Sequence, residues 1–164
     1  MANVIITLPK TLWIAIKNGW KTYECRKNIP KNVTENSKVY VVLKGTSKVA
    51  GCFTVDSYLS TNNFNEVWRY HGHHLFIDRL WFDKYVQNHK GMIHLWKISR
   101  VWEFQDTIDL EEYFGVKHNP QSFIYTDKEP FVRQTLVRML DVEIDRMITP
   151  STWFKGYLHK DLDE

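Results

Sequence analysis

Three residues with side chains suited to chemistry stand close together in the first part of the chain. Lys21, Glu24 and Arg26 place an ammonium group, a carboxylate and a guanidinium group within six positions. Lys21 can act as a base only where burial or a neighbouring cation lowers its pKa toward neutrality, and otherwise it suits phosphate as a fixed charge. Glu24 suits a general base toward water, with Lys21 stabilising a developing oxyanion. A structural ion pair between Glu24 and Arg26 explains the same spacing without a substrate, so the residues alone leave these roles open.

The local sequence predicts the elements that position these residues. Val4–Leu8 reads as a strand, Pro9 opens a helix, and Gly19 ends it. Thr22–Arg26 then alternates and is rich in strand-forming residues, which predicts a second strand. Residues two apart on a strand share a face, so we expect Glu24 to lie on the same face as the guanidinium two positions later.

The rest of the chain predicts an α+β protein. Two strands around the turn at residues 45–47 favour an antiparallel hairpin, and the later segments alternate between helical and strand patterns. Apolar residues three or four apart predict a long amphipathic helix over residues 130–148, which a second copy of the chain could cover to form a homodimer. The expected elements after the second strand are strands at Lys38–Lys44 and Val49–Tyr58, helical structure over Phe64–Val86 with Trp68, Leu75, Leu80 and Tyr85 as candidate buried positions, a strand at Met92–Val101, a short helix at Leu110–Phe114 and the helix at residues 130–148.

The charge of the chain is unevenly distributed. Residues 1–60 hold 9 Lys and Arg against 3 Asp and Glu, residues 61–100 hold 6 against 3, and residues 101–164 hold 7 against 13. A basic front and an acidic back can draw a polyanion toward one face, although two ordinary solvated faces explain the same counts.

Two cysteines without a secretory segment predict a cytoplasmic protein, and no apolar run approaches the roughly 20 residues of a membrane span.

The segment Gly19–Arg26 resembles a known family signature. Its sequence, Gly-Trp-Lys-Thr-Tyr-Glu-Cys-Arg, follows a strand and a helix and looks like the G-x-K-x-x-E-x-R motif of the ASCH family. Residues 91–99 and 120–125 resemble later blocks of bacterial and prophage ASCH proteins. The resemblance covers about residues 3–126, which predicts an ASCH domain over residues 1–126 and a helical extension over residues 127–164 packed on the same domain.

The resemblance implies a fold and two candidate functions. The fold is a PUA-like barrel with a mixed or antiparallel sheet, flanking helices, and a cleft where Lys21, Glu24 and Arg26 converge. The family is linked to RNA or nucleotide binding, so single-stranded RNA or a nucleotide is the expected partner. Some small members are amidohydrolases that use the Lys of the motif, a Thr three residues later and a downstream Glu, and ribonuclease activity has been proposed for others. Here Glu24 stands where that Thr would be, and the downstream region reads Tyr70-His71-Gly72-His73-His74.

These departures favour binding over the amidohydrolase mechanism. A hydrolase that acts on a nucleotide or RNA bond through Lys21 and Glu24 is the alternative. The sequence does not decide whether the protein is an enzyme.

Further ligand contacts are expected from aromatic, basic and amide side chains. Aromatic rings beside basic residues suit base stacking, and amide and hydroxyl groups suit the reading of a base edge, although a turn anchored by Pro120 explains the amide and hydroxyl pair equally well. The predicted ligand-binding residues are Lys21, Arg26, Trp20, Lys44, Trp96, Gln121 and Ser122.

Three histidines, His71, His73 and His74, invite comparison with a zinc site. Zinc ligands on one helix are usually four positions apart, or are completed by well-spaced cysteines, and neither cysteine here lies in a paired motif. We therefore expect no metal and no cofactor, and a connecting loop with solvated histidines.

Overall fold

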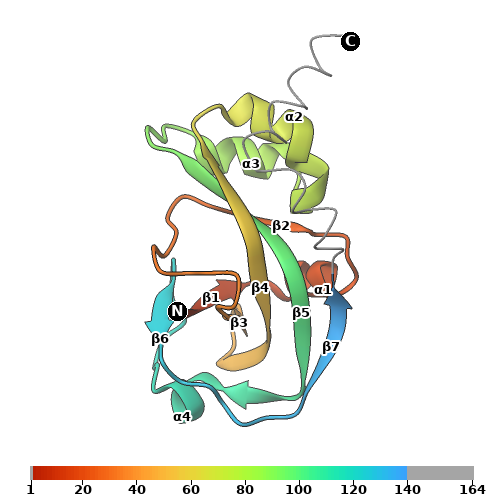
Figure 1. The fold of residues 1–164 in the computed structure, drawn as a ribbon. Coiled ribbons are helices and arrows are strands. Elements are labelled where there is room, and N and C mark those ends of the chain that lie inside the picture. Colours follow the sequence, from red (N-terminus) through yellow and green to blue (C-terminus); the bar gives the residue numbers. More distant parts are fainter. Residues whose placement is uncertain (1, 140–164) are drawn as a thin grey trace.

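The structure is a computed structural model, and it describes residues 2–139. Seven strands and four helices alternate along this part of the chain (Figure 1). None of the described helices has the length and apolar character needed to cross a membrane. The elements are β1 (Asn3–Leu8), α1 (Lys10–Lys17), β2 (Tyr23–Arg26), β3 (Val39–Leu43), β4 (Lys48–Thr61), α2 (Phe64–Leu75), α3 (Arg79–Val86), β5 (Ile93–Asp109), α4 (Leu110–Phe114), β6 (Ile124–Thr126) and β7 (Gln134–Met139).

The strands form one curled sheet of mixed direction. Its hydrogen-bonded order is β2-β5-β4-β3-β1-β6, and β7 also pairs with β5. β1 and β3 run parallel, while every other described pair is antiparallel. β2 pairs with the first part of β5 and β7 with a later part, so both lie along the side of β5 that β4 leaves free. No ladder among the described strands joins β6 to β2 or β7, so the α+β mixed sheet is confirmed but the closed barrel is not.

The first three elements agree with the prediction from the sequence. α1 begins one residue after Pro9, and Gly19 follows it at φ +79°, a left-handed conformation that glycine adopts without steric cost. The amides of both Trp20 and Lys21 donate to the carbonyl of Ala15, which ends the helix and turns the chain into β2. The predicted hairpin is also confirmed, because β3 and β4 pair from Val39 opposite Phe53 onward.

The helical region at residues 64–86 is divided into two helices. Phe76 takes a left-handed conformation, φ +56°, and separates α2 from α3, which lie together at one end of the molecule (Figure 1). Leu75 is fully buried as expected, whereas Leu80 is 74% exposed, which corrects its expected burial. Trp68 and Tyr85 are partly buried. Leu80 follows the first residue of α3, on the side away from Phe82, the buried residue of that helix.

β5 is longer than the sequence indicated. It continues past Val101 to Asp109, and α4 follows at once. The Asp109 carboxylate accepts a hydrogen bond from the Glu112 amide at 3.0 Å, and Gly115 ends α4 at φ +70°. The short helix expected at Leu110–Phe114 is therefore confirmed, with a capping carboxylate before it and a glycine after it.

The expected helix over residues 130–148 is wrong where the structure describes it. Gln134–Met139 form β7, which pairs antiparallel with β5 from Phe104 opposite Gln134 to Arg100 opposite Met139. The free side of β5 offers a row of backbone partners, and this pairing overrides a helical spacing of apolar residues. Residues 140–148 lie outside the described part of the chain, and the homodimer expected through this helix stays a prediction. The proposed boundary at residues 126 and 127 also stays a prediction, although β7 belongs to the same sheet.

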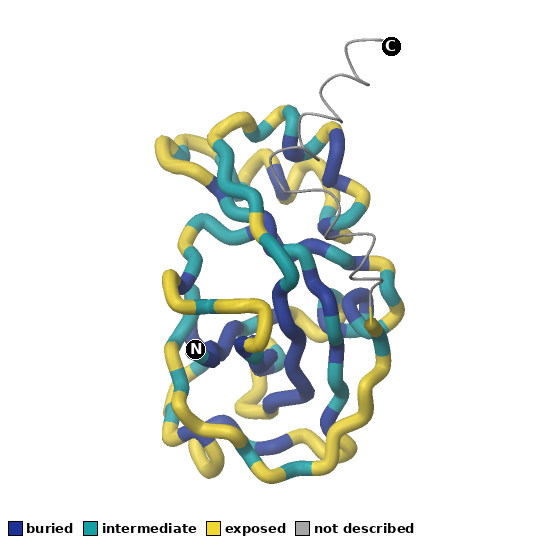
Figure 2. The backbone as a smooth tube through the Cα atoms, in the orientation of Figure 1, coloured by how far each residue is buried: buried dark blue, intermediate teal, exposed yellow. Residues whose placement is uncertain are grey.

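The core consists of three groups of buried apolar side chains. Two lie on the sheet, one around Phe53 and Ile98 and the other around Tyr40 and Phe104. The third joins β2 and the start of β5 to α2 and α3, with Phe82 among its members. Figure 2 shows the buried backbone concentrated along the central strands, with the turns and β7 largely exposed. The third group fixes the helical end of the molecule against β2, the strand that carries the motif.

Candidate ligand-binding cleft

A cleft of about 740 Å³ lies beside β2, between the C-terminal end of β1 and the corner where α2 meets α3. Its lining includes Glu24, Arg26, Lys44 and Gln121, four of the residues that the sequence singled out. Lys21, Trp20, Ser122 and Trp96 are not among the residues that line it.

Lys21 lies beneath the cleft. It is 1% exposed, and its Nζ donates to the carbonyls of Tyr23 and Leu75, each at 2.8 Å. Leu75 is the last residue of α2, so the ammonium group occupies the helix terminus that carries partial negative charge. Burial lowers the pKa of Lys21, while the nearby Glu24 carboxylate acts in the opposite direction. Lys21 is therefore an internal cation held by fixed oxygen atoms.

Glu24 is the buried carboxylate of the cleft. The residue is 5% exposed, and its Oε1 accepts from the Cys25 amide at 3.1 Å and lies 3.6 Å from Lys21 Nζ. Its Oε2 lies 3.7 Å from Arg26 Nη2, too far for a hydrogen bond, and it has no hydrogen-bond partner among the described residues. The carboxylate is thus placed between two cations, with one oxygen still able to accept a hydrogen bond.

Arg26 connects the two ends of the curled sheet. From β2 its Nη1 donates to the Ser122 carbonyl at 3.1 Å, and its Nη2 donates to the Thr7 carbonyl on β1 at 3.3 Å. Thr7 also donates through Oγ1 to the Pro120 carbonyl at 2.7 Å, which holds the segment before β6 against β1. Ser122 therefore contributes its backbone oxygen to this arrangement.

Aromatic side chains line the helical side of the cleft. Trp81 and Tyr85, one helical turn apart on α3, stack with ring centres 5.0 Å apart and planes at 15°. Phe76 lines the same cleft, and Trp20 stacks on it with ring centres 5.9 Å apart. Trp20, Phe76 and Trp81 are 57%, 45% and 49% exposed, so all three offer free ring surface. The exposed Trp20 therefore lies at the margin of the cleft.

The opposite side of the cleft carries a cation and amide groups. Lys44 and Gln121 are exposed, and Asn119 donates through Nδ2 to the Thr46 carbonyl at 2.8 Å.

Asp78 lines the cleft from the start of α3, where its carboxylate accepts from the Trp81 amide. The lining carries two carboxylates, Glu24 and Asp78, and two cations, Arg26 and Lys44, so these charges balance. Lys21 beneath the floor adds positive charge.

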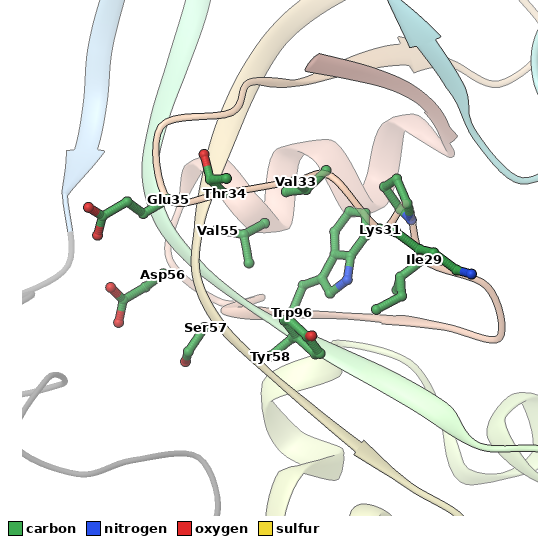
Figure 3. A pocket seen from close by; sticks show the side chains of 11 residues that line it. Ile29, Lys31, Val33, Thr34, Glu35, Val55, Asp56, Ser57, Tyr58 and Trp96 are labelled. Atoms are coloured by element: carbon green, nitrogen blue, oxygen red, sulfur yellow. The ribbon is translucent and has the colours of Figure 1, made fainter. Parts of the chain in front are cut away.

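Trp96 belongs to a different pocket. It stands opposite Glu24 in the pairing of β5 with β2, but it is only 2% exposed and packs into the core. Its indole borders a second pocket, of about 440 Å³, together with Val55 and Tyr58 of β4 and residues 29–31 and 33–35 (Figure 3). The structure therefore separates Trp96 from the other predicted ligand-binding residues.

The three histidines lie on α2, which corrects the expected loop of solvated histidines. His71 is fully buried, His74 is partly buried and only His73 is exposed. Burial lowers the pKa of His71 to about 3 and that of His74 to about 4, with neighbouring histidines adding to both shifts. Within the described residues, no group of three or more His, Cys, Asp or Glu side chains could hold a metal ion.

Sequence reasoning missed the aromatic side of the cleft. Tyr85 was expected only as a buried position, and Phe76 and Trp81 were not singled out. The spacing of Trp81 and Tyr85 on a helix was a usable signal, but nothing local indicated that α3 faces β2.

Comparison with solved structures identifies the fold. No family model and no curated protein sequence matches the chain. Two crystal structures of ASCH from Zymomonas mobilis superpose on it with TM-scores of 0.66. One, of a mutant protein, is 16% identical, and the alignment covers 88% of this chain and 93% of that one. The other is 19% identical, with 75% and 86% covered. The chain has the ASCH fold. In this fold, β1, α1 and β2 place the Gly19–Arg26 segment beside the cleft.

Proposed function

We propose that this ASCH-fold protein binds single-stranded RNA or a nucleotide in the cleft beside β2. One observation carries the proposal. A buried carboxylate with a free oxygen, Glu24, and a guanidinium group, Arg26, lie in a cleft that also presents exposed aromatic rings. Hydrogen-bonding groups beside stacking surfaces are what recognition of an unstacked base requires. The expected cytoplasmic location is part of the same proposal.

The aromatic side supplies the larger share of the binding energy in this proposal. Base stacking on an aromatic side chain contributes roughly 1–3 kcal/mol per base. Trp81 is well suited because Tyr85 supports one side of its ring and about half of the residue is exposed. Trp20, stacked on Phe76 at the margin, is suited to a neighbouring base in a longer strand.

The basic residues have two different roles in this proposal. Lys44 is exposed and lines the cleft, so it can contact a phosphate. Lys21 is buried against two carbonyls, so it holds Glu24 in position and makes no direct contact with the ligand. The expected contact of Lys21 with a phosphate stays a prediction. In this proposal the positive charge of Lys21 acts from beneath the cleft, and Lys44 makes the phosphate contact.

Hydrolysis of a nucleotide or RNA bond is the second candidate function. The lowered pKa of Lys21 and the free oxygen of Glu24 favour it, because a carboxylate in a cleft poor in water is a coherent general base. In this mechanism Glu24 acts on water and Lys21 limits the negative charge that develops nearby.

Titration of a labelled, mixed-sequence single-stranded RNA of eight nucleotides tests both functions. Trp81→Ala should weaken binding about tenfold, which corresponds to one lost stacking contact. The control is Tyr113→Ala, since Tyr113 is 42% exposed on α4 at the other end of the molecule (Figure 1). Equal effects of the two substitutions, or no binding by the unchanged protein, would refute the proposed cleft.

A matched pair of lysines tests the phosphate contact. Lys44→Ala should lower the slope of log affinity against log salt by about 0.7, the change for one phosphate contact on a single strand, whereas Lys90→Ala, on an exposed loop, should not. Chromatography of the same samples detects cleavage. Product that disappears in Glu24→Gln would establish the hydrolase, and intact RNA would leave binding alone.

A further inference from the structure

The free oxygen of Glu24 restricts which ligand the cleft can recognise. Buried polar atoms are almost always hydrogen-bonded, so an exception in a cleft calls for a donor from outside the chain. Glu24 Oε2 is such an exception among the described residues, and the residue is 95% buried beside the cleft that it lines. The ligand should therefore present N–H groups to this carboxylate.

Arg26 adds the complementary requirement. A guanidinium group has five N–H donors, and two of those of Arg26 are used by the Ser122 and Thr7 carbonyls. Its Nη2 lies 3.7 Å from the free carboxylate oxygen, so a donor and an acceptor of the protein stand side by side. A ligand edge that fits has an acceptor next to one or more N–H donors.

We infer that the cleft prefers guanine, because the free Oε2 of Glu24 can accept from guanine N1–H and N2–H while Arg26 donates to O6. This inference rests on the proposed function and names its ligand. Guanine has two adjacent N–H donors on its Watson–Crick edge, and a carboxylate beside them meets no opposing lone pair.

The other bases fit this pair of residues less well. Uracil presents one N–H between two carbonyl oxygens, and a carboxylate placed there is repelled from both sides. Cytosine and adenine each present an amino group next to a ring nitrogen lone pair, so only one hydrogen faces Glu24. A purine also covers more of the exposed Trp81 ring than a pyrimidine does.

Guanine can enter the cleft as a free nucleotide or as part of single-stranded RNA, and both sources present the same edge. Isothermal titration of the full chain with GMP, IMP, AMP, CMP and UMP covers the first source. Eight-nucleotide uridine oligomers with and without one central guanosine cover the second.

We expect guanine to exceed uracil about tenfold in at least one of these two series, the discrimination of one good bidentate pair. We also expect IMP, which lacks the N2 amine, to bind several-fold more weakly than GMP. A preference confined to the oligomers would assign the site to RNA, and a preference confined to GMP would assign it to free nucleotides.

Glu24→Gln should remove the preference for guanine, because an amide places a donor beside the N–H edge. Glu111→Gln on α4 is the control for altered net charge, because it makes the same carboxylate-to-amide change at an exposed position. The ligand series uses only the unchanged protein, so it decides the inference even if the Glu24 variant does not fold. Equal affinity for all bases, or preference for cytosine, adenine or uracil, would overturn the guanine inference and leave RNA or nucleotide binding intact. Absence of binding to every probe would overturn both.

Discussion

Replacement of the buried ammonium of Lys21 should be far more costly than replacement of an ammonium on the surface. The Lys21 and Glu24 side chains are 2% and 6% exposed, whereas those of the ion pair between Lys17 and Glu103 are 28% and 41% exposed. Lys21→Met leaves a buried carboxylate with one cation fewer and removes the donor from two carbonyls. Loss of one partner of a buried pair costs about 3–5 kcal/mol, while a surface pair contributes about 1 kcal/mol or less.

Urea unfolding followed by tryptophan fluorescence measures this difference. With a slope of roughly 2 kcal/mol per molar urea, Lys21→Met should lower the midpoint by about 2 M and Lys17→Met by less than about 0.5 M. The double variant Lys21→Met with Glu24→Gln should cost less than the two single losses added together, because neither charge is then left without its partner. A Lys21→Met midpoint within error of the Lys17→Met midpoint would show that the ammonium is not a buried structural cation, and our account of the cleft floor would be refuted.

Three further predictions concern packing, pH and thiol chemistry. A Cβ at Gly51 would lie 2.2 Å from a backbone oxygen, so Gly51→Ala should destabilise the protein by about 2 kcal/mol or more. Gly45→Ala should cost only about 1 kcal/mol, because Gly45 has open space around it and the cost comes from its φ of +81° alone. Urea midpoints of the two variants measure this difference. Burial lowers the pKa of His71 from 6.5 to about 3, so the unfolded chain takes up a proton that the folded protein does not as the pH falls from 6.5 toward 3, and stability is lost over this range. His71→Gln should therefore flatten the decline of the urea midpoint between pH 6.5 and 4.5. An unchanged decline would contradict this. Burial raises the pKa of Cys25 and of Cys52 to about 12, so a disulfide reagent at pH 8 should modify neither until denaturant is added, and rapid modification of the folded protein would contradict their burial.

The sequence predicted what depends on near neighbours. The helix before Gly19, the hairpin of β3 and β4, and the short helix α4 each follow from residues within a few positions of one another. The face shared by Glu24 and Arg26 also follows from strand geometry alone. The ASCH resemblance could be recognised because its motif lies within this locally determined region.

Other features depend on contacts between distant parts of the chain and could not be read locally. Lys21 is buried because α2 brings the Leu75 carbonyl to it across 54 positions. Trp81 lines the cleft because α3 packs beside β2, and Trp96 faces the core because of its place in β5. The helix expected over residues 130–148 was wrong in its described part because the open side of β5 was not visible in the sequence.

The position of Arg26 has a consequence for how the cleft can move. Among the described residues, the guanidinium group of Arg26 joins the two ends of the sheet by donating to the backbone carbonyls of Ser122 and Thr7, and no ladder of backbone hydrogen bonds crosses between them. Separation of β2 from β1 at this seam therefore needs the loss of two hydrogen bonds, whereas separation of β4 from β5 needs the loss of a whole ladder. Local opening should be easiest at the cleft, so a ligand that binds Arg26 would also change the rate of local opening in this part of the protein.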